Sequence, residues 1–141
     1  MSANGESRLG NKELEALVGH AIHARRHAYA PYSKFEVGAA LLGKRGEVYL
    51  GCNVENAAYP LTICAEQSAV ARAVSEGERN FLAIAIVSST GEPCAPCGAC
   101  RQVLNEFAPD MLVVTTSTAG ELIVSTVREL LPSAFGPQNL R

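Results

Sequence analysis

Two cysteine-containing segments, far apart in the chain, restrict its fold more than any other feature. The first contains Cys64 and Glu66, and the second contains Cys97 and Cys100, with Pro96 just before them. Each segment stands at the start of a stretch that is typical of a helix. Cys97 and Cys100 are three residues apart, so both can face one metal ion from a single helical turn. A fold that joins the two helix starts therefore gathers three thiolates. Such a set suits Zn²⁺ and leaves its fourth tetrahedral position open to water.

The position of Glu66 favours a catalytic zinc site over a structural one. It lies two residues after Cys64 near a helix start, so it cannot easily bind the same ion but can reach a water in the open position. This layout is typical of a hydrolytic zinc site and indicates deamination. Two alternatives stay open. A structural site would recruit a fourth protein ligand, for which Cys94 is equally spaced from Cys97, and a lone C-x-x-C pair can also be a redox pair.

Composition restricts the compartment and the partners. The 141 residues fit one domain, expected at residues 11–141 after a flexible tail at residues 1–10. The net charge is −2 without a basic run, which argues against a nucleic-acid partner. No apolar run is long enough to cross a membrane. We therefore expect a cytoplasmic protein without membrane partners, in which five cysteines, an odd number, fit metal binding better than disulfides.

The spacing of apolar residues predicts an α/β fold. Expected helices cover 11–29, 64–75, 97–107 and 127–131, and expected strands cover 36–42, 47–54, 82–88, 111–116 and 122–126. Asn11 is the expected cap of the first helix, and Pro31 follows its end. This alternation predicts one mixed sheet with helices on its faces.

Several segments together resemble cytidine deaminases of the small, homotetrameric kind. They occupy 30–35, 53–60, 64–66, 96–102 and 130–137, within a match from about residue 12 to about residue 137. Long motifs in this order are far more specific than one C-x-x-C pair. The resemblance implies a three-layer α/β/α fold with a five-stranded mixed sheet and one Zn²⁺ per chain. It implies hydrolysis of cytidine and 2′-deoxycytidine to uridine and 2′-deoxyuridine with release of ammonia, as in pyrimidine salvage.

The resemblance also implies roles for single residues. Cys64, Cys97 and Cys100 would bind zinc, and Glu66 would be the catalytic proton shuttle. The backbone N–H of Ala65 would bind the pyrimidine O2.

The remaining implied roles concern the substrate and the assembly. Asn53 and Glu55 would bind the ribose 3′-hydroxyl, and Phe35 would pack against the nucleoside. Phe135 would stack on the base in a neighbouring subunit's site, and Tyr59 would belong to the intersubunit wall. The expected assembly is a homotetramer with shared active sites.

One position departs from the pattern that the family implies. Many members have arginine directly after the catalytic glutamate, where this chain has Gln67. Gln67 can donate hydrogen bonds to sulfur but carries no charge, so helix N-termini and Arg101 would have to offset more of the thiolate charge.

Other functions are compatible with parts of the pattern. A deaminase of another aminopyrimidine nucleoside, such as a blasticidin-type antibiotic, would keep the cysteines and Glu66 but would not need Asn53, Glu55 or Phe135. A non-catalytic structural zinc module would not need Glu66. Deaminases of polynucleotides commonly have histidine in place of Cys64.

Overall fold

Five strands form one sheet whose spatial order differs from their order in the chain. The computed structural model describes residues 9–140. The strands are β1 (Val37–Gly43), β2 (Val48–Cys52), β3 (Phe81–Ser88), β4 (Leu112–Thr116) and β5 (Leu122–Thr126), arranged β2-β1-β3-β4-β5. The β3–β4 pair is parallel, and the other neighbouring pairs are antiparallel. The expected five-stranded mixed sheet is therefore confirmed.

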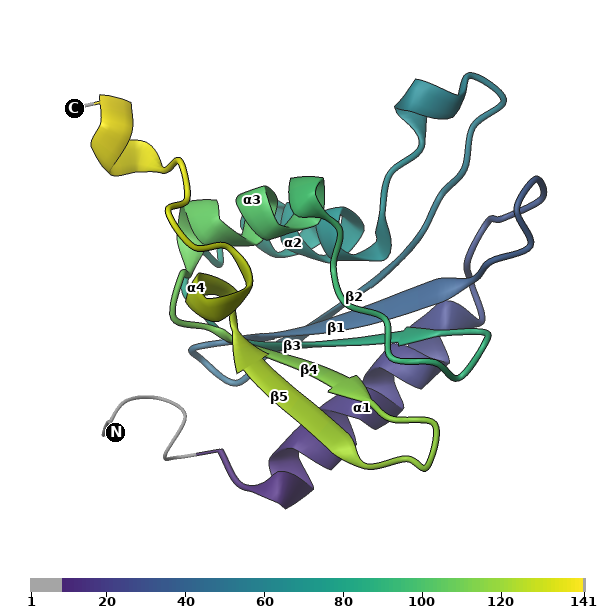
Figure 1. Cartoon of the computed structure of the whole chain (residues 1–141), viewed down its shortest axis with the longest axis horizontal. Coiled ribbons are helices and arrows are strands. Elements are labelled where there is room, and N and C mark those ends of the chain that lie inside the picture. The colour runs from purple at the N-terminus through teal and green to yellow at the C-terminus, as the bar shows by residue number, and fades with distance from the viewer. Residues whose placement is uncertain (1–8, 141) are drawn as a thin grey trace.

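Helices cover both faces of this sheet and make three layers (Figure 1). Helix α1 (Asn11–Arg25) lies on one face, while α2 (Ala65–Ser75) and α3 (Gly98–Phe107) lie on the other. Helix α3 is also the crossover between the parallel strands β3 and β4, as parallel pairing requires. The short α4 (Val127–Leu130) follows β5, and 3₁₀ turns cover Tyr59–Leu61 (η2) and Pro137–Leu140 (η3).

Side chains of alternate strand residues divide the core into two halves. Leu41, Ile84 and Ile86 pack with α2 and α3, whereas Ala40 and Ala85 pack with α1. The small alanines on the α1 side let that helix approach closely. The same strands are buried on both faces, which explains their nearly unbroken apolar sequence.

Two glycines set the distance between the sheet and its helices. A Cβ added to Gly38 in β1 would lie 2.1 Å from the carbonyl oxygen of Ala21 in α1. A Cβ added to Gly51 in β2 would lie 2.4 Å from the backbone nitrogen of Ala69 in α2. Both helices thus rest backbone against backbone on the sheet. This contact places the start of α2, with Cys64, over the sheet.

The boundaries of α1 differ from the sequence prediction. Gly10, not Asn11, is the N-cap, and its N–H donates to Glu13 Oε1 at 2.9 Å. The helix ends at Arg25 and not near residue 29, because the backbone of Tyr29 pairs with the segment after β2 instead: Tyr29 N–H donates to the Asn53 carbonyl at 3.0 Å. The backbone of Tyr29 thus pairs with a segment distant in sequence instead of extending α1.

Two predictions concern the ends and the surroundings of the chain. Residues 1–8 of the expected tail lie outside the described residues, while Leu9 packs against the α1 half of the core. Among residues 9–140, no helix combines the length and the apolar character needed to cross a membrane. All five cysteines are free thiols.

Candidate zinc and substrate site

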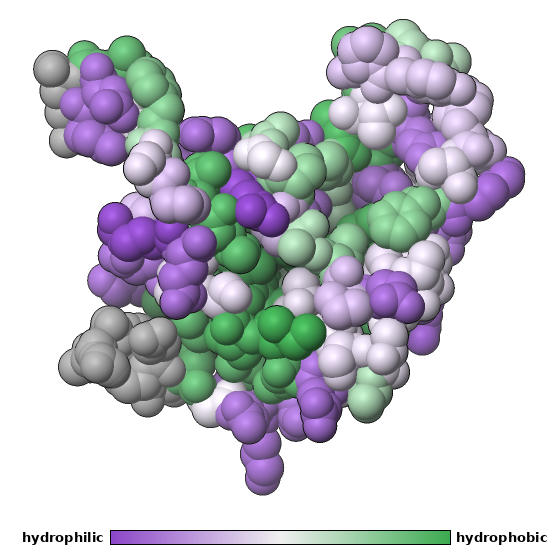
Figure 2. Space-filling view, in the orientation of Figure 1, coloured by the Kyte–Doolittle hydropathy of each residue, from purple (hydrophilic) through white to green (hydrophobic). Residues whose placement is uncertain are grey.

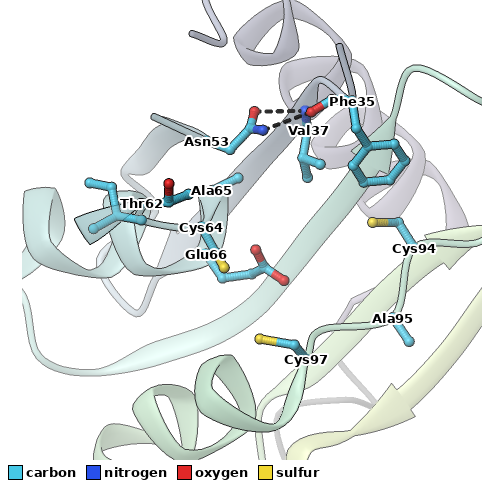
Figure 3. Close-up of a pocket in the computed structure, with 11 residues that line it drawn as sticks. Phe35, Val37, Asn53, Thr62, Cys64, Ala65, Glu66, Cys94, Ala95 and Cys97 are labelled. Carbon is cyan, nitrogen blue, oxygen red and sulfur yellow. Dashed lines mark hydrogen bonds between the residues drawn. The ribbon is translucent and has the colours of Figure 1, made fainter. Parts of the chain in front are cut away.

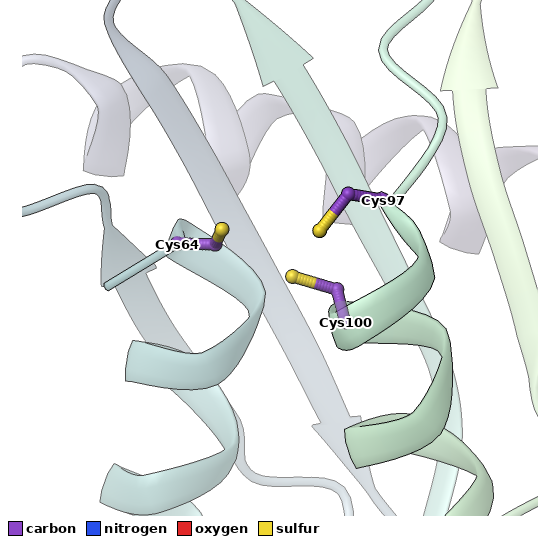
Figure 4. A group of neighbouring side chains, drawn as sticks. All are labelled: Cys64, Cys97 and Cys100. Atoms are coloured by element: carbon purple, nitrogen blue, oxygen red, sulfur yellow. The ribbon is translucent and has the colours of Figure 1, made fainter. Parts of the chain in front are cut away.

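The N-termini of α2 and α3 bring three cysteine sulfurs together (Figure 4). Cys64 is the N-cap of α2, Cys97 is the N-cap of α3, and Cys100 lies in the first turn of α3. Their Sγ atoms all lie within 4.8 Å of one another. Tetrahedral Zn–S bonds of about 2.3 Å would place the sulfurs about 3.8 Å apart, so the donor set fits zinc with small adjustments. It is the only such group of three or more potential ligands in the described part of the chain.

The backbone explains why these cysteines point at one another. Cys64 and Cys97 have extended cap conformations, while their carbonyls already accept the first intrahelical hydrogen bonds, from Ser68 N–H at 3.0 Å and Arg101 N–H at 2.9 Å. An N-cap side chain turns toward the helix end, where N–H groups carry partial positive charge. Both caps therefore hold a thiol in a place that stabilises a thiolate.

Gln67 and Arg101 both form hydrogen bonds to backbone groups near the three cysteines. The Gln67 Oε1 atom accepts the backbone N–H of Cys64 at 3.2 Å, so this side chain caps α2. Arg101 donates from Nε to the Pro96 carbonyl and from Nη1 to the Leu130 carbonyl, each at 2.7 Å. Arg101 thus fixes the loop before Cys97 and joins it to the end of α4.

The three thiols differ in acidity. Burial raises the pKa of Cys64 and, more strongly, that of Cys100. Burial also acts on Cys97, but the backbone N–H groups of Cys100 and Ala99, together with the neighbouring thiols, outweigh it and lower the pKa of Cys97. Cys97 is therefore the thiol best prepared to be a thiolate, the form that binds metal.

A cavity of about 210 Å³ opens beside the sulfurs (Figure 3). Glu66 is 4% exposed, and its carboxyl points into the cavity, where burial raises its pKa. Glu66 does not belong to the ligand group, as its position after Cys64 predicts. Cys94 also lies in the cavity wall outside that group, and burial raises its pKa to about 11. Cys64, Cys97 and the non-ligand carboxyl of Glu66 thus line one cavity, and the buried Cys100 completes the sulfur group without lining it.

Three other residues singled out from the sequence line the same cavity, namely Phe35, Asn53 and Ala65. Asn53 is 8% exposed and is held at both ends of its amide: Oδ1 accepts from Val37 N–H at 2.9 Å, and Nδ2 donates to the Phe35 carbonyl at 2.7 Å. An amide nitrogen carries two hydrogens, so one N–H of Asn53 remains available.

Glu55 and Tyr59 lie in an adjoining hollow of about 440 Å³, which shares Thr62 with the first cavity. The Glu55 carboxylate accepts the Ser33 hydroxyl and the backbone N–H groups of Tyr32 and Ser33. The Ser33 hydroxyl is the largest cause that lowers the pKa of Glu55. Tyr59 is 71% exposed.

Phe135 is separate from both cavities. It follows α4 in the C-terminal segment, and its side chain is 58% exposed. The fold of a single chain therefore does not bring this residue to the sulfurs.

Sequence signals for the rest of the cavity wall are weaker. Thr62 and Ile63 precede Cys64, Ala95 precedes Cys97 by two positions, and Val37 starts β1. Proximity to a ligand in the sequence could have indicated the first three. Val37 enters the wall only because β1 passes beneath α2.

Comparisons with known proteins agree with this geometry. Residues 11–116 match the family model described as the cytidine and deoxycytidylate deaminase zinc-binding region. A protein of Sporosarcina psychrophila, named cytidine deaminase, is 50% identical over 129 residues, covering 91% of this chain and 95% of that protein. The crystal structure of cytidine deaminase from Burkholderia pseudomallei has a TM-score of 0.82 at 51% identity, covering 86% of this chain and 98% of that one. That of cytidine deaminase from Mycobacterium tuberculosis has a TM-score of 0.79 at 42% identity, covering 88% and 98%.

A family match over most of the chain and relatives of this identity define the class. The chain belongs to the cytidine and deoxycytidylate deaminase family of zinc-binding enzymes.

Proposed function

We propose that this chain is a zinc-dependent cytidine deaminase, which hydrolyses cytidine and 2′-deoxycytidine to uridine and 2′-deoxyuridine and releases ammonia. The observation that carries the proposal is the buried Glu66 carboxyl, which lines the same cavity as Cys64 and Cys97 of the three-sulfur group without belonging to the ligand group. The names of relatives about half identical to this chain support the same activity.

The residues of the cavity can carry out the proton transfers that this reaction needs. When bound by Cys64, Cys97 and Cys100, zinc supplies Lewis acidity that activates a water molecule near neutral pH. Glu66 takes a proton from the attacking water and gives one to the pyrimidine N3, which makes C4 more electrophilic. Once the C4–O bond has formed, the same carboxyl takes the second proton of the former water from the new C4 hydroxyl and passes it to the amine. The C4–N bond then breaks, ammonia departs, and the C4 carbonyl of the product remains.

Neighbouring groups orient the nucleoside. The Ala65 N–H binds the pyrimidine O2, and Phe35 packs against the nucleoside. The remaining N–H of Asn53 binds the ribose 3′-hydroxyl, and its bonds to the backbone on both sides of Glu36 fix the direction of that donor. Glu55 binds the same hydroxyl from the adjoining hollow.

The assembly we propose is a homotetramer with shared sites. Figure 2 shows two projections on one side of the molecule with a hollow between them, formed by the η2 loop and the C-terminal segment. They carry large apolar side chains that are mostly exposed in the single chain: Tyr59, Leu61, Phe135 and Leu140. Exposed apolar side chains on both sides of one hollow are compatible with a contact between subunits. Tyr59 forms part of the wall between subunits, and Phe135 stacks on the base in a neighbour's site.

The cytoplasmic location and a role in pyrimidine salvage belong to the same proposal. A free nucleoside is the substrate for which the cavity is suited, and the five free thiols are compatible with a reducing compartment.

The activity is tested by the loss of cytidine absorbance in the ultraviolet, together with ammonia release. We expect one ammonia per cytidine or deoxycytidine consumed by protein that holds one zinc per chain. A blasticidin-type nucleoside and a cytosine-containing single-stranded oligonucleotide serve as comparison substrates. Zinc-loaded protein that releases no ammonia from either nucleoside contradicts the proposal. Faster turnover of the antibiotic than of cytidine would mean that the substrate is an antibiotic nucleoside.

Shared sites are tested by complementation. Inactive Glu66→Gln chains are mixed with Phe135→Ala chains under conditions that allow subunit exchange. Hybrids then contain sites with Glu66 from one chain and Phe135 from its neighbour, so activity should exceed the sum of the separate parents. A fully active monomer in light scattering rules out sharing.

A further inference from the structure

Side chains of α3 hold the C-terminal segment that carries Phe135. Gln102 donates an amide N–H to the backbone carbonyl of Phe135 at 2.9 Å, and Asn105 approaches the same oxygen at 3.4 Å. Arg101 holds the start of the segment through the Leu130 carbonyl at 2.7 Å. One helix thus fastens both ends of the stretch between Leu130 and Phe135.

The backbone around this stretch has a conformation that free chains avoid. Ser133 has φ of +56°, in the left-handed region, which costs energy for a residue other than glycine. Such a residue persists where its surroundings determine the backbone. Gly136, next to Phe135, is buried, and its N–H donates to Asn139 Oδ1 at 2.8 Å. The backbone of Phe135 is therefore fixed on both sides.

The side chain of Phe135 contrasts with its backbone. The backbone carbonyl accepts two amide donors, one of them from Asn105, which is only 8% exposed, yet the Phe135 side chain is 58% exposed. Burying an amide is costly unless it is hydrogen-bonded, so Asn105 gives the segment a definite anchor. An exposed aromatic on a fixed backbone is prepared to contact something outside its own chain.

We propose that Gln102 and Asn105 are positioning residues, which fix the Phe135 backbone so that its ring enters the substrate site of a second copy of the chain in a preset direction. This inference rests on the proposed function, because it takes Phe135 as the residue that completes a neighbour's site. Fixing the segment before binding lowers the entropy lost when substrate is bound. Because α3 also carries Cys100 and starts after Cys97, one short helix links a chain's own metal site to its neighbour's substrate site.

The test is a double-mutant cycle on zinc-loaded protein, with Gln102→Ala, Phe135→Ala and the double variant. Gln102→Ala should raise KM for cytidine by about two- to tenfold, the range for loss of one hydrogen bond, with kcat and zinc content unchanged. In the Phe135→Ala background, the same change should add nothing, because it acts through the ring. Gln102→Glu, which keeps the shape but loses the N–H donor, should match Gln102→Ala, and Gln102→Arg, which keeps a donor, should restore KM.

Glu106→Ala is the matched control, since Glu106 is exposed on the same helix and its side chain makes no hydrogen bond within residues 9–140. It should keep the wild-type KM. Hydrogen exchange gives a readout without substrate: amides in residues 131–137 should exchange faster in Gln102→Ala than in Glu106→Ala.

Four results would overturn the proposal. Equal exchange in the two variants means that Gln102 does not order the segment. An equal rise in KM with and without the Phe135 ring means that Gln102 acts elsewhere. If Phe135→Ala raises KM while Gln102→Ala does not, the positioning role alone fails. If Phe135→Ala keeps the wild-type KM, both the positioning role and the shared-site part of the proposed function fail.

Discussion

Replacement of Glu66 by glutamine separates the chemistry from the architecture of the site. Glutamine has nearly the same shape as glutamate, so Glu66→Gln preserves the packing of a side chain that is 4% exposed. The carboxyl is not among the metal-ligand atoms, so the zinc content should stay at one per chain. The change removes the negative charge and, with it, the ability to accept and return a proton.

The magnitude follows from the content of the cavity. Among the described residues that line it, Glu66 is the only carboxylate, so none of them is a second acid that could take over the transfers. General acid–base catalysis contributes about 10²–10⁴-fold, or about 2.7–5.4 kcal/mol of activation free energy. We expect a loss in kcat at the upper end of this range, because in the proposed mechanism one carboxyl serves the water, N3 and the leaving amine.

The assay follows cytidine absorbance and ammonia release, with zinc measured by elemental analysis and folding by thermal denaturation. Cys94→Ser is the matched control, since Cys94 lies in the same cavity wall outside the ligand group. It should keep both zinc and the reaction class. A Glu66→Gln protein that retains zinc and more than about a tenth of the wild-type kcat refutes the role of Glu66.

Three further predictions concern metal, packing and pH. Cys97→Ser should lower the zinc content, while Cys94→Ser should leave it unchanged. If elemental analysis shows that Cys94→Ser loses zinc, the site is closed and structural. Gly38→Ala should lower the melting temperature, because overpacking against helix backbone typically costs about 1–3 kcal/mol, whereas Gly19→Ala, with open space around its Cβ and inside α1, should raise it. The Asn80 N–H and then Arg45 lower the pKa of the Glu78 carboxyl, so its contribution to stability is complete above about pH 4.3 and disappears as pH falls through the lower folded pKa. Glu78→Gln should therefore melt below wild type at pH 7, and the gap should close in acid; a gap that widens in acid contradicts this assignment.

The sequence by itself determined the metal chemistry and most of the framework. Three thiols with ligand spacing and an acid beside one of them restrict the site to soft-metal chemistry with a non-ligand carboxyl, and the fold joins Cys64 to Cys97 and Cys100 accordingly. The apolar run that forms β3 predicts a central strand because both of its faces are buried. Such patterns involve residues close in sequence, so they can be recognised without knowing which distant residues pack against them.

Only the tertiary structure decided which groups the polar side chains bind. The amide of Asn53 is set by backbone groups 16 and 18 positions away, at Val37 and Phe35. The Gln67 side-chain oxygen accepts the Cys64 N–H. Helix α1 ends at Arg25 because the backbone of Tyr29 forms a hydrogen bond with the segment after β2.

Phe135 shows the limit of what a single chain decides. The motif predicts its importance, but the structure places its side chain on the surface while Gln102 and Asn105 fix its backbone. Hydrophobic period and ligand type are properties of neighbouring residues in sequence. Hydrogen-bond pairing depends on which atoms the completed fold brings within about 3 Å, and only the structure supplies that information.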